Sequence, residues 1–386
     1  MVTGAYYPEL SGASLQCRAL MRALADRVSF AVFTTTIDRG LPRTATVDGV
    51  PIRRVPVDPN RLSSKLRASS AMIRGFAAAA AGRDIVHFHG FSQKTVPLVA
   101  LARVGRKHLV MKQTSIGHDD AVSLAERGML ARWTARRIDC LVAPSPAFAV
   151  RHAQGPFART PLRVIPNGVD TRRFAPADAH ARAAARRALG LPEHARVVLH
   201  VGFFSREKAV DLLFDAWART AARWTDSVLV LVGATQPGHG EIDPAIAPRV
   251  REDARRHGLA SRVVFVERTD DIDTYYRAAD LFVLASLREG LPNVLLEAMA
   301  TGVASIASRL PGVTDSVITD GVDGLLVPPG DRARLEAAID SLLADPSRAA
   351  TLGAAARCTI ETRYAMPAVA DAYAKLYEEI LGRCAE

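Results

Sequence analysis

The stretch that decides how this chain is interpreted reads Glu289-Gly-Leu-Pro-Asn-Val-Leu-Leu-Glu297-Ala-Met-Ala-Thr-Gly302. It predicts a loop and then a helix, because Pro292 suits the first helical position, where its missing N–H would have no partner anyway. The first-turn amides, at 293–295, are expected to be free to bind an anion. Glu289 would lie on the loop near the anion and Glu297 about a turn into the helix. Since carboxylates repel phosphate, we interpret both as ligands of neutral hydroxyls, on a sugar and a ribose.

Strand-like and helix-like segments alternate on both sides of this stretch. The first half has apolar strand patterns at 29–34, 84–89, 109–113 and 140–144, and helical patterns at 14–27, 62–81, 96–104 and 124–138. The second half begins the alternation again, with strands at 196–202, 228–233, 263–266, 281–284 and 304–307. Strands that alternate with helices form parallel sheets with helices on both faces. The expected fold class is α/β, with two Rossmann-like, doubly wound domains facing a central cleft.

A turn at Pro166-Asn-Gly168 marks the expected domain boundary. Residues 1–167 form the predicted first domain and residues 168–365 the second. The start of the chain, residues 2–6, reads as only the tail of a strand. The strand is therefore expected either to begin upstream or to form a truncated edge of the sheet.

Length and composition exclude several classes of protein. A chain of 386 residues that is 49% hydrophobic suits two domains of ordinary size. It contains no apolar run of about 18 residues and no signal peptide pattern at its start. The four cysteines show no paired spacing, so neither a zinc site nor a disulfide framework is predicted. These features favour a protein of the cytoplasm.

The positive charge is concentrated in the first half of the chain. Residues 1–168 carry 24 Lys and Arg against 10 Asp and Glu, a net charge of +14. Residues 169–386 carry 26 against 30, a net charge of −4. This asymmetry indicates an anionic partner for the first half: a membrane surface, an acidic acceptor or nucleic acid. A general bias toward arginine is the alternative, since the chain has 44 Arg and only 6 Lys.

Several motifs occur in a fixed order along the chain. The first joins the domains and the others follow in the second domain: Ile165-Pro-Asn-Gly-Val-Asp170, Val201-Gly-Phe-Phe-Ser-Arg-Glu-Lys208, Ala278-Ala-Asp-Leu-Phe-Val-Leu-Ala-Ser286 and Asp320-Gly-Val-Asp-Gly-Leu-Leu-Val-Pro328. Together with the two glutamates they resemble the retaining GT-B glycosyltransferases, specifically glycosyltransferase family 4 (group 1). The resemblance covers nearly the whole chain and is strongest from His200 to Gly330.

The resemblance implies a reaction and its partners. A nucleotide-sugar donor, a UDP-sugar or GDP-sugar, would bind mainly to the second domain, and the acceptor mainly to the first. The last helix, about 366–386, would pack back on the first domain. The implied reaction moves a hexose to a sugar, lipid-linked or other hydroxyl acceptor, with retention, in glycan, polysaccharide or glycolipid biosynthesis. No metal ion and no cofactor beyond the donor co-substrate are implied.

The resemblance also assigns residues. Lys208 and Arg206 would hold the donor diphosphate, Glu289 would contact the transferred sugar, and Glu297 would accept from ribose hydroxyls. Glu289, Lys208 and Arg206 are therefore the predicted catalytic residues. The predicted donor-binding residues are Gly12, Gly202, Arg206, Lys208, Arg268, Leu291, Asn293, Val294 and Glu297. The alternative for Lys208 is a solvated loop charge, and for the glutamates a helix N-terminal acid that complements the dipole.

The chain departs from the family pattern at three positions. Phe203 stands where the family often has arginine, directly after the glycine of the basic loop. Gly12 is the only one kept of the usual paired glycines in a first-domain loop, and such a glycine is also common in a simple turn. Gln113 stands where several members have histidine. Glutamine binds a hydroxyl but cannot act as a base.

His89, Gln113 and Asp119 are the acceptor-side candidates in the first domain. We expect His87 and His89 to face opposite sides of their strand, with His89 toward the cleft and His87 in the core. Asp119 and the adjacent Asp120 are expected to be solvated loop acids, with the reading of acceptor hydroxyls as the alternative. A metal site needs several convergent ligands, and none is predicted.

Two basic segments are candidates for an anionic membrane surface. One spans residues 60–76, and the other is a helix with Arg127, Arg132, Trp133, Arg136 and Arg137. Either one, if it binds lipid, would place the protein at the inner face of the membrane; solvated helix faces are the alternative.

Two other functions stay open: a sugar-nucleotide epimerase on the same fold and a nucleic-acid-binding protein. The epimerase would need acids and bases that move a ring proton, and Gln113 cannot act as one. For the nucleic-acid-binding protein the chain lacks aromatic interleaving, so no nucleic-acid partner is expected.

Overall fold

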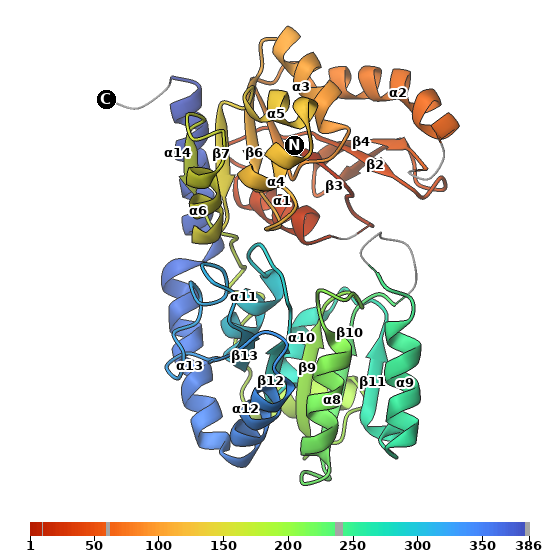
Figure 1. Ribbon diagram of the computed structural model, residues 1–386, viewed down its shortest axis with the longest axis vertical. Helices are drawn as coiled ribbons and strands as arrows, with labels where there is room; N and C mark the ends of the chain where they lie inside the picture. Colours follow the sequence, from red (N-terminus) through yellow and green to blue (C-terminus); the bar gives the residue numbers. More distant parts are fainter. Residues whose placement is uncertain (10, 59–61, 236–241, 383–386) are drawn as a thin grey trace. The chain divides into compact units, whose positions relative to one another are not determined.

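The structure is a computed structural model that describes residues 1–9, 11–58, 62–235 and 242–382. It divides the chain into two compact units (Figure 1). Unit 1 consists of Met1–Gly168 together with Met366–Glu386, and unit 2 consists of Val169–Ala365. The last helix of the chain therefore belongs to the same unit as the first half.

Unit 1 contains a sheet with the strand order β3-β4-β2-β1-β5-β6-β7-β8. All neighbours are parallel except β3 and β4, which form an antiparallel hairpin. The strands are β1 Val2–Thr3, β2 Val32–Thr36, β3 Thr44–Val47, β4 Val50–Pro56, β5 Ile85–His89, β6 His108–Lys112, β7 Cys140–Ala143 and β8 Leu162–Val164. The short β1 lies between β2 and β5, so the expectation of a truncated edge is wrong.

Helices cover both faces of this sheet. They are α1 Gly12–Ala23, α2 Leu62–Ala80, α3 Thr95–Val104, α4 Ala121–Glu126, α5 Met129–Ala135, α6 Pro146–Gln154 and α14 Met366–Ile380. One core lies under α2 and α3 around Phe33 and Phe88, and another under α1 and α14 around Val110 and Tyr373. The helix predicted at 124–138 is instead two helices, because Gly128 takes a positive φ of 95° between them.

The hairpin of β3 and β4 was not predicted, although it carries a local signal. Asp48 and Gly49 form its two-residue turn with φ of 52° and 77°. Positive φ at both positions is typical of a type I′ turn, for which Asp-Gly is a preferred sequence. The Asp48 carboxylate also binds Arg18 at 2.7 Å and Arg22 at 2.8 Å, and these hydrogen bonds lower the pKa of Asp48.

Unit 2 contains an entirely parallel sheet with the strand order β11-β10-β9-β12-β13-β14. Its strands are β9 Arg196–Val201, β10 Ser227–Val232, β11 Val263–Val266, β12 Leu281–Leu284, β13 Ala304–Ser308 and β14 Leu325–Val327. Its helices are α7 Ala179–Ala188, α8 Val210–Ala221, α9 Ile246–Arg256, α10 Ile272–Ala278, α11 Asn293–Ala300, α12 Arg332–Ala344 and α13 Pro346–Arg363. Apolar cores on the two faces hold the helices to the sheet. The prediction of two doubly wound halves is confirmed.

The strand order of unit 2 fixes where a ligand site is expected. The chain winds outward from β9 through β10 to β11, then returns to place β12 on the other side of β9. In doubly wound sheets ligands bind at the carboxyl ends of the strands, at the point where the winding reverses. In unit 2 that point lies between β9 and β12. In unit 1 it lies between β1 and β5.

Candidate active site

Lys208 and Glu289 meet at the reversal point of unit 2. Lys208 follows β9 and Glu289 follows β12, and Lys208 Nζ lies 2.5 Å from Glu289 Oε1. The Ser286 hydroxyl donates to the same oxygen at 2.8 Å. The side chain of Glu289 is 9% exposed and that of Lys208 is 21% exposed. Neither is therefore a solvated loop charge.

Two further contacts join the loops that carry this pair. The Leu287 N–H donates to the Glu207 carbonyl at 2.7 Å, and Arg288 forms an ion pair with the Glu207 carboxylate. Lys208 is itself held by an N–H···O bond to the Ser205 carbonyl at 3.1 Å, directly before α8. The backbone of both loops is thus fixed, and the short distance between Lys208 and Glu289 follows from it.

The basic loop leaves β9 through a close approach of two backbones. A Cβ built on Gly233, at the end of β10, would lie 1.8 Å from the carbonyl oxygen of Gly202. Only glycine fits at position 233 without displacing Gly202. The predicted donor residue Gly202 therefore serves the geometry of the loop that ends at Lys208.

Glu297 lies on α11 and is the second acid of the site. The Tyr276 hydroxyl, from α10, donates to Glu297 Oε2 at 3.0 Å and also contacts the Val294 carbonyl at 3.2 Å. Withdrawal from water raises the pKa of Glu297 to about 7, although the bond from Tyr276 and the charge of Arg173 oppose this shift. Glu297 is partly buried and lies in the second turn of α11, beyond the first turn where an acid complements the helix dipole, so the geometry favours a ligand role.

The start of α11 differs from the prediction. The helix begins at Asn293, and Pro292 is its N-cap residue instead of its first helical residue. The Leu295 amide donates to the Pro292 carbonyl at 3.2 Å, so the prediction that it is free is wrong. Leu291 and Val294, two predicted donor residues, pack with the apolar core of unit 2.

The two predicted arginines lie apart from the Lys208–Glu289 pair. The Arg206 side chain is 89% exposed, and its Nε lies 2.9 Å from Asp243 Oδ2. Arg268 is also exposed, with a guanidinium nitrogen 3.8 Å from Asp270 Oδ1. The structure therefore brings together Lys208 and Glu289, but it does not direct the Arg206 guanidinium toward them.

The acceptor-side acids of unit 1 are fully buried, so the expectation that they are solvated is wrong. Asp119 accepts from the amides of Thr114 and Ser115 at 2.9 and 3.0 Å and from the Thr114 hydroxyl at 2.7 Å. Asp120 caps α4 by accepting from the Ser123 amide at 3.1 Å. Gln113 donates to the Asp119 carbonyl at 3.0 Å. Burial raises the pKa of Asp119, and its bonds show that it organises the loop after β6.

His87 and His89 lie on the same face of β5, so the prediction of opposite sides is wrong. Residues two apart in a strand share a face, and the two rings lie 4.5 Å apart. His87 Nδ1 lies 2.8 Å from the Tyr377 hydroxyl of α14. Both rings are buried, and burial holds the pKa of His89 well below its usual value. His89 is therefore part of the core of unit 1.

Gly12 and Lys94 lie beyond the carboxyl ends of β1 and β5, two strands of unit 1. Gly12 is the first residue of α1, after a capping box in which Ser11 and Ser14 exchange hydrogen bonds. Sequence reasoning missed Lys94, which lies after β5 at the reversal point. Its Nζ donates to the Thr3 carbonyl and to the Thr35 hydroxyl, each at 2.8 Å. Burial lowers the pKa of Lys94 to about 7. The sequence feature that could have identified Lys94 is its position shortly after the predicted strand at 84–89.

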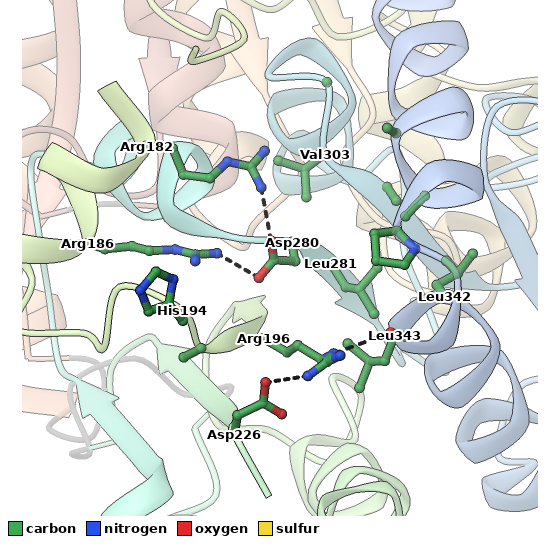
Figure 2. A pocket seen from close by; sticks show the side chains of 16 residues that line it. Arg182, Arg186, His194, Arg196, Asp226, Asp280, Leu281, Val303, Leu342 and Leu343 are labelled. Carbon is green, nitrogen blue, oxygen red and sulfur yellow. Dashed lines mark hydrogen bonds and ion pairs between the residues drawn. The ribbon is translucent and has the colours of Figure 1, made fainter. Parts of the chain in front are cut away.

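A cavity of about 390 Å³ lies at the opposite, amino ends of the unit 2 strands (Figure 2). It contains none of the predicted site residues. Arg182 and Arg186 bind Asp280 at 2.9 and 2.7 Å, and Arg196 pairs with Asp226, so the arginines of the cavity already have acidic partners.

The described residues contain no group of three or more His, Cys, Asp or Glu that could hold a metal ion. In the same part of the chain, no helix combines the length and apolar character needed to span a bilayer.

Two family models match the chain. The model described as glycosyl transferases group 1 matches residues 195–345, which lie in unit 2. The model described as glycosyl transferase 4-like domain matches residues 11–168, which lie in unit 1. Each unit thus corresponds to one model.

Similar proteins match over most of their length. The chain is 31% identical over 372 residues to the D-inositol 3-phosphate glycosyltransferase of Kribbella flavida, covering 90% of this chain and 86% of that protein. Sucrose-phosphate synthase from Thermosynechococcus elongatus has a TM-score of 0.80 at 24% identity, with 99% of each chain covered. HepE from Anabaena, in complex with UDP-glucose, has a TM-score of 0.77 at 20% identity, covering 98% of this chain and 99% of that chain. At these identities the structural matches establish a shared fold.

Proposed function

We propose a specific reaction for this chain, which belongs to the glycosyl transferases group 1 family and has its GT-B fold. The chain is a glycosyltransferase. The proposed reaction transfers a hexose from a nucleoside diphosphate sugar to a hydroxyl acceptor, with retention at the anomeric carbon and without a metal ion. The products would serve glycan, polysaccharide or glycolipid biosynthesis.

The observation that carries the proposal is the Lys208–Glu289 pair at the reversal point of unit 2. An ammonium has three N–H donors, and Glu289 Oε1 takes one of them at 2.5 Å. The proposal assigns one of the remaining donors to the donor diphosphate. Glu289 Oε1 also receives the Ser286 hydroxyl, so Oε2 is the oxygen assigned to a hydroxyl of the transferred sugar.

The chemistry of the step follows from these assignments. A glycosyl donor loses its diphosphate as the sugar gains positive character, so the leaving charge needs a preorganised cation. Lys208 supplies that cation, held by Glu289 on the loop that leads into α11. Glu297 would accept from the ribose hydroxyls. In the proposed step the acceptor oxygen bonds to the anomeric carbon on the face from which the diphosphate leaves, and the hydroxyl proton passes to the leaving phosphate oxygen, which gives retention.

The proposal also concerns the nucleotide of the donor and the chemical class of the acceptor. The HepE structure contains UDP-glucose, which supports a uridine nucleotide here, and a GDP-sugar is the alternative. The D-inositol 3-phosphate glycosyltransferase relative supports a polar hydroxyl acceptor. Unit 1 would bind that acceptor, and its positive net charge suits a phosphorylated or lipid-linked one.

A panel of nucleoside diphosphate sugars tests the proposal. We expect one of them to raise the thermal midpoint of the protein in a saturable way, and the same one to be consumed only when a hydroxyl acceptor is added. Conversion of the sugar nucleotide without an acceptor would identify an epimerase instead. No saturable shift with any uridine or guanosine diphosphate sugar would contradict the proposed donor class.

Glu297→Gln tests the ribose contact through its dependence on pH. The raised pKa means that ionised Glu297 destabilises the folded state, so this destabilisation is absent below about pH 4.5 and complete above about pH 7. Glu297→Gln should therefore raise the thermal midpoint at about pH 8 and leave it unchanged at about pH 4. It should also weaken nucleoside diphosphate binding at the higher pH, measured by calorimetry. The exposed Glu252 is the control, since Glu252→Gln should change neither quantity.

A membrane surface is a second proposed partner, and one observation favours it. Met129 and Leu130, at the start of α5, are 86% and 67% exposed. Arg127, Arg132 and Arg136 surround them in the sequence, and apolar side chains among basic ones favour anionic lipid surfaces. The other candidate segment, residues 60–76, lies partly outside the described residues. The proposal therefore places the protein peripherally at the inner face of a membrane.

Vesicle co-sedimentation measures this second proposal. We expect binding to vesicles with anionic phosphatidylglycerol at low salt, and several-fold weaker binding with pure phosphatidylcholine. Replacing Met129 and Leu130 with serine should reduce binding to the anionic vesicles. Val150→Ser is the matched control, because Val150 is 57% exposed on another helix of unit 1. Equal binding of both variants would contradict a role for the start of α5.

A further inference from the structure

His200 lies where the pairing between β9 and β12 ends. The paired register of the two strands runs through Leu281 opposite Val198 and Phe282 opposite Leu199. His200 is the next residue on β9, and its Nδ1 lies 3.0 Å from the Val283 carbonyl of β12. A carbonyl only accepts, so Nδ1 carries the proton and Nε2 keeps the lone pair. The imidazole thus bridges the two strands at the point where they separate.

The other ring nitrogen is buried and faces the loop that ends at Lys208. His200 is fully buried, and its Nε2 has no hydrogen-bond partner among the residues that the structure describes. A Cβ built on Gly202 would lie 3.2 Å from this nitrogen and 3.7 Å from Lys208 Cδ. The imidazole edge and the Lys208 stem therefore approach the same small space, and the absent side chain at Gly202 leaves it open.

A buried acceptor without a donor is destabilising and requires an explanation. Burial lowers the pKa of His200 to about 4, and the charge of Lys208 acts in the same direction, although the bond to Val283 and the charge of Glu289 oppose it. His200 is therefore neutral at physiological pH and can accept at Nε2. Lys208 carries a charged donor whose stem approaches the same space, and its bond to Glu289 uses only one of its three N–H groups.

We propose that His200 is a positioning residue for Lys208, and that its Nε2 accepts a hydrogen bond from the Lys208 ammonium when a donor sugar engages Glu289. This inference rests on the proposed function, because it concerns the state in which the nucleotide sugar is bound. Glu289 then contacts the sugar, and the bond to His200 keeps the ammonium directed at the diphosphate. His200 itself touches neither substrate.

A double-mutant cycle separates this role from a purely structural one. His200→Asn is the first variant, since an asparagine amide can reach the Val283 carbonyl as Nδ1 does but cannot replace Nε2. His200→Phe is the second, because it keeps the ring and loses both nitrogens. Each is combined with Lys208→Met, and binding of a nucleoside diphosphate and of the matching nucleoside is measured by calorimetry. Circular dichroism and the thermal midpoint confirm that each variant is folded.

We expect His200→Asn to weaken nucleoside diphosphate binding by about tenfold, the size of one hydrogen bond to a charged group. Nucleoside binding should not change, because a nucleoside has no phosphate for Lys208. In the Lys208→Met background neither His200 variant should have a further effect. The exposed His257 supplies the control, since His257→Asn should match the wild type.

Additive losses in the cycle would overturn the inference, because His200 would then act independently of Lys208. Equal weakening of nucleoside and nucleoside diphosphate would also overturn it and assign His200 a structural role. Wild-type protein that binds no nucleoside diphosphate would contradict the proposed function itself, before either His200 variant is compared. The two failures are therefore distinguishable.

Discussion

Lys208→Met is expected to lower kcat/KM for the donor by about 10²- to 10³-fold, the usual loss when one preorganised charge-stabilising group is removed. The ammonium is the cation that the proposal places on the leaving diphosphate. Methionine keeps most of the stem volume and removes the charge. The loss should appear in donor binding as well as in turnover, since the diphosphate is present before and after the sugar leaves. Initial rates at varied donor concentration measure both.

Two other variants decide whether the loss is specific to this site. Lys375→Met removes an exposed lysine of unit 1 and should leave the rate unchanged. Arg206→Met is more informative, because Arg206 lies two residues from Lys208 but is 89% exposed and bound to Asp243. We expect it to lower kcat/KM by less than about tenfold, as an exposed ion pair contributes little. Equal losses in Lys208→Met and Arg206→Met would show that the loop acts through its summed charge.

The layered fold was predictable because buried parallel strands have a local signature. Residues 228–232 of β10 form an unbroken buried apolar run, and β11 and β12 occupy the predicted ranges. The order of the strands has no such signature, since it depends on which distant segments pair. The central position of Val2–Thr3 is the clearest case: two residues give no periodicity, and their neighbours β2 and β5 decide their place.

The candidate site was predictable in its residues but not in its geometry. The motif order singled out Lys208 and Glu289, which are 81 positions apart, and only the adjacency of β9 and β12 explains their contact. Side-chain direction was not accessible in the same way. Asp119 and Asp120 look like solvated loop acids in the sequence. In the structure both are buried, because Asp119 accepts from amides that follow β6 and Asp120 accepts from an amide at the start of α4. His200 carries no motif, and its importance rests entirely on the strands around it.

Gly233→Ala is expected to lower the free energy of unfolding by about 3 kcal/mol or more, because the new Cβ overpacks against backbone. The new Cβ would lie 1.8 Å from the Gly202 carbonyl oxygen, 2.6 Å from its carbonyl carbon and 3.3 Å from the Phe203 nitrogen. None of these atoms belongs to a side chain that could turn away. The backbone of β9 and β10 must therefore separate, although Gly202 is held by an N–H···O bond of 2.9 Å to Val232.

Gly353→Ala separates the effect of this change on stability from its effect on the site. A Cβ on residue 353, in α13, would lie 2.0 Å from the carbonyl oxygen of Gly302, which follows α11. This contact is as severe as that at Gly233. Both variants should lower the thermal midpoint of the protein, whereas Gly105→Ala in unit 1, with contacts no closer than 3.5 Å, should not. Gly233 supports the loop that carries Lys208, so Gly233→Ala alone should also weaken donor binding by the protein that remains folded, measured by calorimetry below the midpoint. If Gly353→Ala weakens donor binding equally, the loss reflects general loosening of unit 2, and the close approach of Gly202 and Gly233 has no particular part in placing Lys208.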